Sequence, residues 1–304
     1  MKHVALLGLC LGAVGCHAEP ETSKVRVVAT TGMIADAVKR VGGDRVSVTC
    51  LMGPGVDPHR YTPTPGDLAA LSRAKVVFFN GLHLEGKMTD VLEHGRGPKA
   101  IAVTRNLGPK QLRTGEGADG SHDPHVWFDV KLWTACVEAV RDGMCETDPG
   151  HAPEYTANAE AYLKELAALD AEVRSKADAI PKDRRVLVTS HDAFGYFAAA
   201  YGFEVRGLQG VSTAAETTTK DVTDLAQFLG TRKVPAVFGE TSVPPKGLQA
   251  VLDAVKAKYH FDVKLVGGDD ALYSDALGEP GTPGDTYTGM VRHNIGVIAS
   301  ALGR

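Results

Sequence analysis

Cysteines are few in this 304-residue chain, and their positions exclude a disulfide scaffold. Beyond Cys16 the cysteines are Cys50, Cys136 and Cys145, an odd number without a CxxC spacing. Cys136 and Cys145 share one expected helix, which would hold them about 13 Å apart. A disulfide spans at most roughly 7 Å between Cα atoms. The three are therefore predicted to be small buried hydrophobes, with no thiolate metal site.

An excess of positive charge and long apolar runs are also missing. Lys and Arg number 33 against 37 Asp and Glu, without a basic cluster, which excludes a nucleic-acid partner. The apolar run Val4–Leu11 is too short to span a bilayer and ends in small residues before Cys16, as in a secretory signal peptide over residues 1–18. Cys16 is the candidate for lipidation, and cleavage after Ala18 is the alternative. The sequence thus predicts a periplasmic or cell-surface protein anchored to a membrane by lipid.

Short β-branched runs alternate with amphipathic helical stretches in both halves of the chain. This alternation predicts an α/β fold with two lobes, residues 24–150 and 184–304, each with a largely parallel sheet. The expected strands of both lobes are Val25–Val28, Val46–Leu51, Lys75–Asn80, Ala100–Thr104, Arg185–Ser190, Phe203–Leu208, Ala236–Gly239 and Val263–Val266. Thr213 and Glu216 have the spacing of a capping box, which predicts that a helix of the second lobe begins there.

A long helix is expected to join the lobes over residues 152–181. The stretch Glu154–Ile180 contains neither Pro nor Gly, and Pro153 and Pro181 flank it. At 1.5 Å per residue such a helix would be about 40 Å long, enough to cross a small domain. Its apolar positions at helical spacing are Tyr155, Tyr162, Leu166, Leu169 and Val173. The sequence therefore predicts a rigid helical connection between the lobes.

Four side chains of types that bind metal ions stand at the ends of expected strands, or in the loops between a strand and the next helix. They are His59, His125, His191 and Asp275, two in each half of the chain. Ligands of open α/β sheets gather beyond the carboxyl ends of the strands, so these side chains are expected in a cleft between the lobes. Three imidazoles and one carboxylate suit a divalent ion such as Zn²⁺. No His-Glu-x-x-His pair or comparable catalytic motif accompanies them, which favours capture of the ion over catalysis.

Several neighbouring residues compete for these roles. His122 lies three residues before His125, but Pro124 disfavours the helical geometry that would align the two imidazoles. Glu240 follows a strand and is a candidate to accept a hydrogen bond from a ligand imidazole, with a surface or capping acid as the alternative. Asp269 and Asp270 follow glycines, where acids usually bond locally in a turn, so Asp275 is preferred.

The segments around these residues resemble a known family, the zinc- and manganese-binding solute-binding proteins of bacterial ABC importers, and the TroA-type members in particular. The likeness covers nearly the whole chain after the signal and rests on Gly53–His59, Asn80–Glu85, Asp123–Trp127, Ser190–Phe197, Gly207–Ser212 and Leu272–Leu277. It implies two α/β lobes joined by a long helix, with His59, His125, His191 and Asp275 as metal ligands. It also implies a membrane permease and a cytoplasmic ATPase as partners.

Two features bear on the metal within this resemblance. Manganese-binding members tend to have Glu where this chain has His191, which favours Zn²⁺ over Mn²⁺. Dedicated zinc members often carry a His-rich loop before the Asp-Pro-His motif, whereas the stretch from Arg113 to Asp123 is short and holds only His122. Two other functions remain open at this point, a zinc-dependent hydrolase and a surface adhesin or interaction protein.

Overall fold

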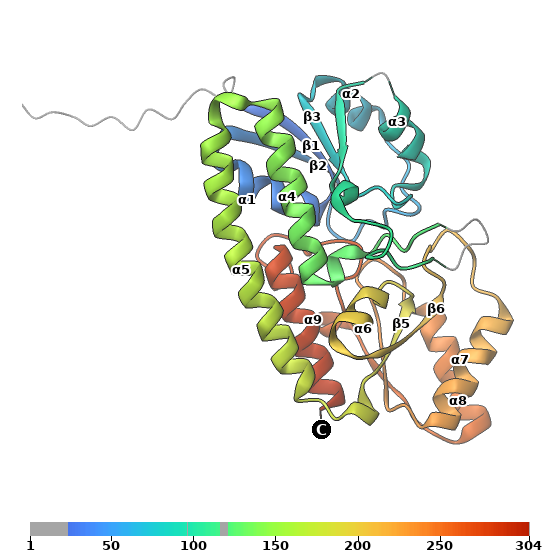
Figure 1. Cartoon of the computed structure of the whole chain (residues 1–304). Helices are drawn as coiled ribbons and strands as arrows, with labels where there is room; N and C mark the ends of the chain where they lie inside the picture. The colour runs from blue at the N-terminus through green and yellow to red at the C-terminus, as the bar shows by residue number, and fades with distance from the viewer. Residues whose placement is uncertain (1–23, 96, 116–120, 304) are drawn as a thin grey trace, which may run out of the picture.

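The computed structural model describes residues 24–95, 97–115 and 121–303, which form two α/β lobes along a single long helix (Figure 1). Each lobe is built on one four-stranded sheet in which all neighbouring strands run parallel. The predicted fold class is confirmed. The expected signal segment, with Cys16 and Ala18, lies outside the described residues.

The two sheets repeat the same topology. The strands of the first lobe are β1 (Val25–Thr31), β2 (Val46–Met52), β3 (Val76–Phe79) and β4 (Lys99–Ala102). Those of the second lobe are β5 (Val186–His191), β6 (Glu204–Gln209), β7 (Ala236–Phe238) and β8 (Lys264–Val266). The strand orders are β2-β1-β3-β4 and β6-β5-β7-β8. In each lobe the second strand therefore lies on one side of the first strand, and the third and fourth strands lie on the other side. Such a reversal opens a crevice at the carboxyl ends of the strands, where ligands bind in open α/β sheets.

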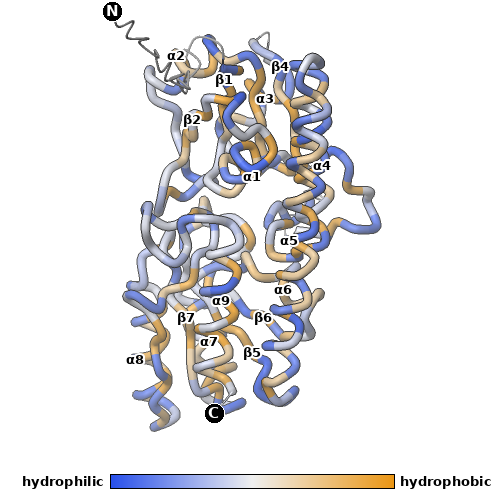
Figure 2. The backbone as a smooth tube through the Cα atoms, turned by 90° about the vertical axis from the view of Figure 1, so that its left-hand side faces the viewer, coloured by the Kyte–Doolittle hydropathy of each residue, from blue (hydrophilic) through white to orange (hydrophobic). Residues whose placement is uncertain are grey.

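Helices cover both faces of each sheet, which explains why the central strands are rich in buried Val and Phe. The helices are α1 (Gly32–Gly42), α2 (Pro65–Arg73), α3 (Thr89–His94), α4 (Val130–Thr147), α5 (Ala152–Asp178), α6 (Gly195–Tyr201), α7 (Thr219–Arg232), α8 (Lys246–Tyr259) and α9 (Tyr287–Leu302). Polar and apolar residues alternate along the outer helices, as Figure 2 shows for α8. None of the described helices has both the length and the apolar character that a bilayer crossing needs.

Helix α5 runs beside both lobes and packs against α1, α4 and α9 (Figure 1). The five apolar positions predicted to face the core are all at most 1% exposed. They belong to one continuous buried cluster that includes Val27 of the first sheet and Phe238 of the second. The lobes therefore share a core along α5. Pro153 is tolerated in the first turn of α5, where its missing N–H has no partner to lose.

The capping box predicted at Thr213 is wrong. Helix α7 begins at Thr219, and its N-cap is Thr218. The hydroxyl of Thr218 accepts a hydrogen bond from the backbone N–H of Asp221 at 3.2 Å. The carboxylate of Asp221 accepts one from the backbone N–H of Thr218 at 2.7 Å. Both sites carry the same Thr-x-x-acid pattern, so local sequence does not distinguish them. The hydroxyl of Thr213 instead donates to Asp57 of the other lobe.

The described cysteines are all unpaired, as predicted. Cys136 on α4 is buried, but Cys50 and Cys145 are only half-buried. Cys50 lies on the edge strand β2, and Cys145 lies near the end of α4, which explains why neither is fully enclosed.

Candidate metal centre

Four side chains from four separate segments converge between the lobes. His59 lies in the loop after β2, His125 directly precedes the short 3₁₀ helix η5 (Val126–Phe128), His191 is the last residue of β5, and Asp275 follows β8. One potential ligand atom from each lies within 4.8 Å of the others. All four are the residues singled out in the sequence, and the topology brings them together because each leaves the carboxyl side of its lobe toward the same cleft.

The distances among these atoms suit a small tetrahedral site. Nε2 of His59 lies 3.2 Å from Nε2 of His125. Nε2 of His125 lies 3.4 Å from Oδ1 of Asp275, and Nε2 of His191 lies 3.2 Å from Oδ2 of the same carboxylate. A zinc ion bound by N and O atoms at about 2.0–2.1 Å separates the donors of a tetrahedron by about 3.3 Å. These three donor pairs are thus close to the spacing that such an ion requires, while Nε2 of His59 lies 3.8 Å from Oδ2 of Asp275.

The site is closed to solvent and contains polar atoms without partners. His125 and His191 are 0% exposed, Asp275 is 1% exposed and His59 is 8% exposed. Among the residues that the structure describes, Nε2 of His191 and both carboxylate oxygens of Asp275 find no hydrogen-bond partner. Buried polar atoms are costly when unsatisfied, and a carboxylate is more so. Their unused electron pairs all face one point, so a divalent cation fits the group.

Burial and neighbouring charges shift the pKa values of these groups in different directions. Burial lowers the pKa of His59 to about 3, despite the attraction of Asp275, so this imidazole stays neutral. Burial also disfavours the charged form of His125, but its hydrogen bond to Asp123 and the nearby negative charge of Asp275 raise its pKa to about 9. Burial opposes ionisation of Asp275, yet His191 and His125 hold its pKa well below the usual range. An ion bound here would take over the positive charge that protons otherwise supply.

Carboxylates orient two of the three imidazoles. The backbone N–H and Nδ1 of His125 both bond to Oδ1 of Asp123, at 3.0 and 2.8 Å. His191 is held in the same way, with its backbone N–H on Oε1 of Glu240 at 2.9 Å and its Nδ1 on Oε2 at 2.6 Å. A carboxylate at Nδ1 favours the tautomer that carries the proton there, which leaves Nε2 free to bind a metal. The structure thus places Glu240 directly beside His191.

His59 is held differently. Its backbone N–H donates to Oδ1 of Asp57 at 2.9 Å, but among the described residues no carboxylate lies within hydrogen-bonding distance of its Nδ1. The second oxygen of Asp57 accepts from the hydroxyl of Thr213 at 2.6 Å. Among the three imidazoles, His59 is thus the one for which the described residues provide a carboxylate partner at the backbone only and not at Nδ1.

The rival residues lie outside the cluster. His122 is half-buried, and its Nδ1 lies 3.3 Å from the backbone oxygen of Arg113. Asp269 and Asp270 are exposed in the short 3₁₀ helix η8 (Gly268–Asp270). His293 on α9, which is not one of these rivals, also lies outside the cluster and bonds through Nε2 to the backbone oxygen of Ala271 at 3.0 Å. None of these side chains belongs to the group of four.

Trp127 supports two members of the cluster from opposite lobes. Its ring packs against His125 with the centroids 5.2 Å apart. Its Nε1–H also donates to the backbone oxygen of Ser274 at 3.0 Å, next to Asp275. The indole therefore fixes the Asp275 segment as well as the His125 loop.

Asp57 and Asp123 are the supporting residues that the sequence analysis missed. Both belong to an Asp-Pro-His tripeptide, at residues 57–59 and 123–125, and in both the Asp carboxylate accepts from the His backbone N–H. Asp side chains commonly accept from the backbone two residues on. The repetition of this tripeptide before two candidate ligands was the signal that could have identified them.

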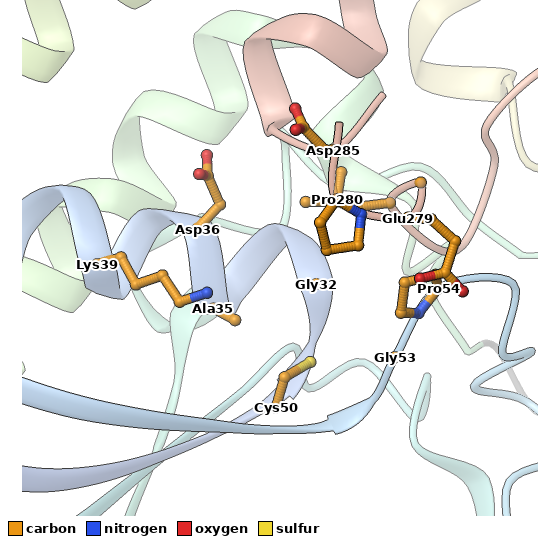
Figure 3. Close-up of a pocket in the computed structure, with 12 residues that line it drawn as sticks. Gly32, Ala35, Asp36, Lys39, Cys50, Gly53, Pro54, Glu279, Pro280 and Asp285 are labelled. Atoms are coloured by element: carbon orange, nitrogen blue, oxygen red, sulfur yellow. The ribbon is translucent and has the colours of Figure 1, made fainter. Parts of the chain in front are cut away.

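A cavity of about 440 Å³ lies beside the site, between α1 and the loop that follows Asp275 (Figure 3). We call the segment between β2 and α2 the His59 loop. Gly53 and Pro54, at the start of this loop, face Glu279 and Pro280 of the second lobe across the cavity. The four clustered side chains do not line this cavity. The lobes are therefore not in continuous contact on this side of the His59 loop.

Comparison with known proteins agrees with the geometry of the site. Residues 27–301 match the family model described as zinc-uptake complex component A, periplasmic. The chain belongs to this family. The resemblance inferred from the sequence motifs is confirmed across nearly the whole described chain.

Three relatives show how closely the chain follows this zinc-uptake component A family. The zinc-binding protein TroA of Treponema pallidum (strain Nichols) is 49% identical over 305 residues, which cover 99% of this chain and 97% of TroA. The solved structure of periplasmic TroA superposes with a TM-score of 0.88 at 50% identity, over 92% of this chain and all of that one. The manganese-binding lipoprotein MntA of Bacillus subtilis (strain 168) is 44% identical over 98% of this chain and 95% of its own length. The metal ABC transporter substrate-binding lipoprotein SsaB of Streptococcus sanguinis is 29% identical over both full chains.

Proposed function

We propose that this protein is the extracytoplasmic component of an ABC importer that captures Zn²⁺, with Mn²⁺ as a weaker cargo, and delivers it to a membrane permease. The observation that carries the proposal is the convergence of His59, His125, His191 and Asp275 on one buried point, where Nε2 of His191 and both oxygens of Asp275 have no hydrogen-bond partner among the described residues. Family membership and the metals in the names of the relatives support the same function.

The four side chains are proposed as the ligands of the transported ion. Nε2 of His191 and Nε2 of His125 face the centre because carboxylates hold their Nδ1 atoms. The carboxylate of Asp275 would offset one of the two charges of the ion, and the closed site would replace its water shell. Imidazole suits Zn²⁺, whereas the harder Mn²⁺ prefers more oxygen ligands and a higher coordination number.

The same geometry argues against a zinc-dependent hydrolase. Catalytic zinc usually keeps three protein ligands, an open position for water and a nearby general base. Here four donors surround one point. Glu240, the acid that could act as a base, has both oxygens bonded to His191. We therefore propose that the protein carries out no reaction on its ligand.

We further propose that the chain is exported and anchored through lipid on Cys16, and that its permease works with a cytoplasmic ATPase. The lipoprotein names of MntA and SsaB support the anchor. Within the exported part, residues 24–150 and 184–304 are proposed as the two lobes, and residues 152–181 as the segment that links them.

Metal analysis of the protein purified without added metal tests the proposal. Wild-type protein should carry close to one equivalent of Zn²⁺, and competition between Zn²⁺ and Mn²⁺ should favour Zn²⁺. A His59→Ala/Asp275→Ala double variant serves as the control, because it removes one ligand from each lobe. Substoichiometric binding in the wild type, or equal binding in the double variant, would contradict the proposed site.

A further inference from the structure

Thr213 is a buried threonine in an otherwise exposed loop. It lies between β6 and α7, and it is 2% exposed while its neighbours Ser212 and Ala214 are exposed. A polar side chain is buried at little cost only when its hydrogen bonds are satisfied. The hydroxyl of Thr213 is satisfied by Asp57, which belongs to the other lobe. This one side chain therefore reaches from the second lobe across the cleft into the first.

The bond that Thr213 makes is short and charge-assisted. Its Oγ1 lies 2.6 Å from Oδ2 of Asp57. Hydrogen bonds to a carboxylate are about twice as strong as those between neutral groups. The other oxygen of Asp57 holds the backbone N–H of His59 at 2.9 Å. One carboxylate thus connects the ligand His59 to the opposite lobe.

The position of His59 depends on the bond between Asp57 and Thr213, whereas His125 and His191 are each held by a carboxylate that bonds to both backbone and ring. Asp123 and Glu240 each hold both the backbone and the ring of their histidine. Asp57 holds only the backbone of His59, because its second oxygen is committed to Thr213. His59 is also the most exposed of the four clustered residues, at 8%.

The base of the His59 loop has room to move. Gly53 and Pro54 line the cavity between the lobes, with Glu279 and Pro280 on its far side (Figure 3). A Cβ atom placed on Gly53 would meet nothing within 4 Å. The loop is therefore held over the site at its tip, by Asp57 and Thr213, more firmly than at its base.

We propose that the hydrogen bond between Thr213 and Asp57 is a latch across the cleft that sets how fast the ion leaves. When the latch is closed, the second lobe holds the His59 loop over the site. When it opens, His59 withdraws first, since its ring has no carboxylate of its own. Thr213 is thus a positioning residue, which acts on the ion through Asp57 and His59. This inference rests on the proposed function.

Release kinetics test the latch. Zn²⁺-loaded protein is mixed with excess EDTA in a stopped-flow instrument, and the release and association rates are measured for wild type and variants. Thr213→Val keeps the shape of the side chain and removes the hydroxyl. Release of Zn²⁺ should therefore accelerate at least about fivefold, while association should change by less than about twofold. The reason is that affinity differences between closely related complexes are mostly differences in the release rate. Thr213→Ser keeps the hydroxyl and should restore release to within about twofold of wild type.

A double-mutant cycle separates a latch from a general structural role. If Thr213 acts through Asp57, then Thr213→Val should add less than about twofold to the release rate of Asp57→Ala, because the bond is already lost. Thr147→Val is the matched control, since it removes a threonine hydroxyl bonded to a backbone oxygen on α4, far from the cleft. It should leave release unchanged.

The outcomes distinguish the two proposals. A wild type that binds no Zn²⁺ contradicts the proposed function. If the wild type binds Zn²⁺ but releases it no more slowly than Thr213→Val, the latch is overturned and the proposed function stands. The same conclusion follows if Thr213→Val and Asp57→Ala have independent effects on the release rate in the double variant. If Thr213→Val does not fold, Thr213→Ala in the same assay gives the same comparison with Thr213→Ser.

Discussion

Glu240 accepts two hydrogen bonds from His191, one from the backbone N–H at 2.9 Å and one from the ring Nδ1 at 2.6 Å. Both residues are buried, His191 at the end of β5 and Glu240 just after β7. Thr189 of β5 pairs directly with Phe238 of β7, so the sheet itself sets the separation of the two side chains. The orientation of the imidazole is therefore fixed by the fold before any ion arrives.

Glu240→Gln should lower the affinity for Zn²⁺ by about tenfold to a hundredfold. The amide would place an NH₂ group against one of the two donors of His191, and loss of such an outer partner typically has this effect on metal sites. Competition titration with a zinc chelator measures the change. Glu160→Gln, an exposed acid on α5, is the control and should keep wild-type affinity. Equal affinity of the Glu240 variant and wild type would show that the hydrogen bonds do not position the ligand.

His59→Ala should weaken Zn²⁺ binding by more than tenfold and change the free energy of unfolding of the metal-free protein by less than about 1 kcal/mol. The loss of binding follows from removal of one donor of four, and the small effect on folding follows because His59 lies on a loop and is the most exposed of the four clustered residues. Thermal unfolding with and without Zn²⁺ reports both, because ligand binding raises the midpoint according to affinity. His94→Ala, an exposed histidine whose side chain is 77% exposed, is the control. A metal-free His59→Ala protein that unfolds would indicate a structural site.

His191→Glu should reduce the preference for Zn²⁺ over Mn²⁺ by at least about tenfold, or roughly 1.4 kcal/mol. The change replaces a soft imidazole by a harder carboxylate, which suits Mn²⁺ and allows a higher coordination number. The ratio of the two affinities, measured by competition, gives the result. His122→Glu is the control, because His122 lies outside the cluster. An unchanged ratio in His191→Glu would place selectivity elsewhere in the cleft.

Asp67→Asn should destabilise the protein by about 1 kcal/mol at pH 7, the usual cost of losing a capping interaction. Partial burial works against the charged form of Asp67, but hydrogen bonds from Tyr61 and Thr64 lower its pKa below the usual value. A lowered pKa contributes stability that is present above the unfolded pKa of about 3.9 and is lost as pH falls through the folded value. The difference between variant and wild type in urea unfolding should therefore shrink below about pH 4. A difference that stays constant down to pH 2.5 would contradict this origin.

The sequence predicted those features that depend on residues near one another in the chain. The β-branched runs gave both sheets, and the apolar positions of α5, such as Leu166 and Val173, are buried as their spacing indicated. The four clustered side chains were found because each stands in a recognisable local motif.

Features that depend on a distant partner could not be predicted in this way. Thr213 carries the pattern of a helix cap, yet its hydroxyl bonds to a residue 156 positions away. The shared core of the two lobes likewise depends on how α5 packs against α1 and α9, which a linear pattern does not specify. Asp123 could have been predicted as a supporting residue, since its Asp-Pro-His tripeptide repeats that of His59. Its bond to Nδ1 of His125 could not, because that bond depends on how the loop folds.

The four donors come from both ends of the chain, with His59 early in the first lobe and Asp275 late in the second. No product of synthesis that stops short of Asp275 contains all of them, and an unfolded chain does not hold them together. A protein that crosses the membrane before it folds must therefore cross without cargo, however much zinc the cytoplasm contains. For a chain exported in this way, loading would begin only on the far side, once Asp275 has joined His59, so the order of assembly alone would prevent metal from being carried out of the cell.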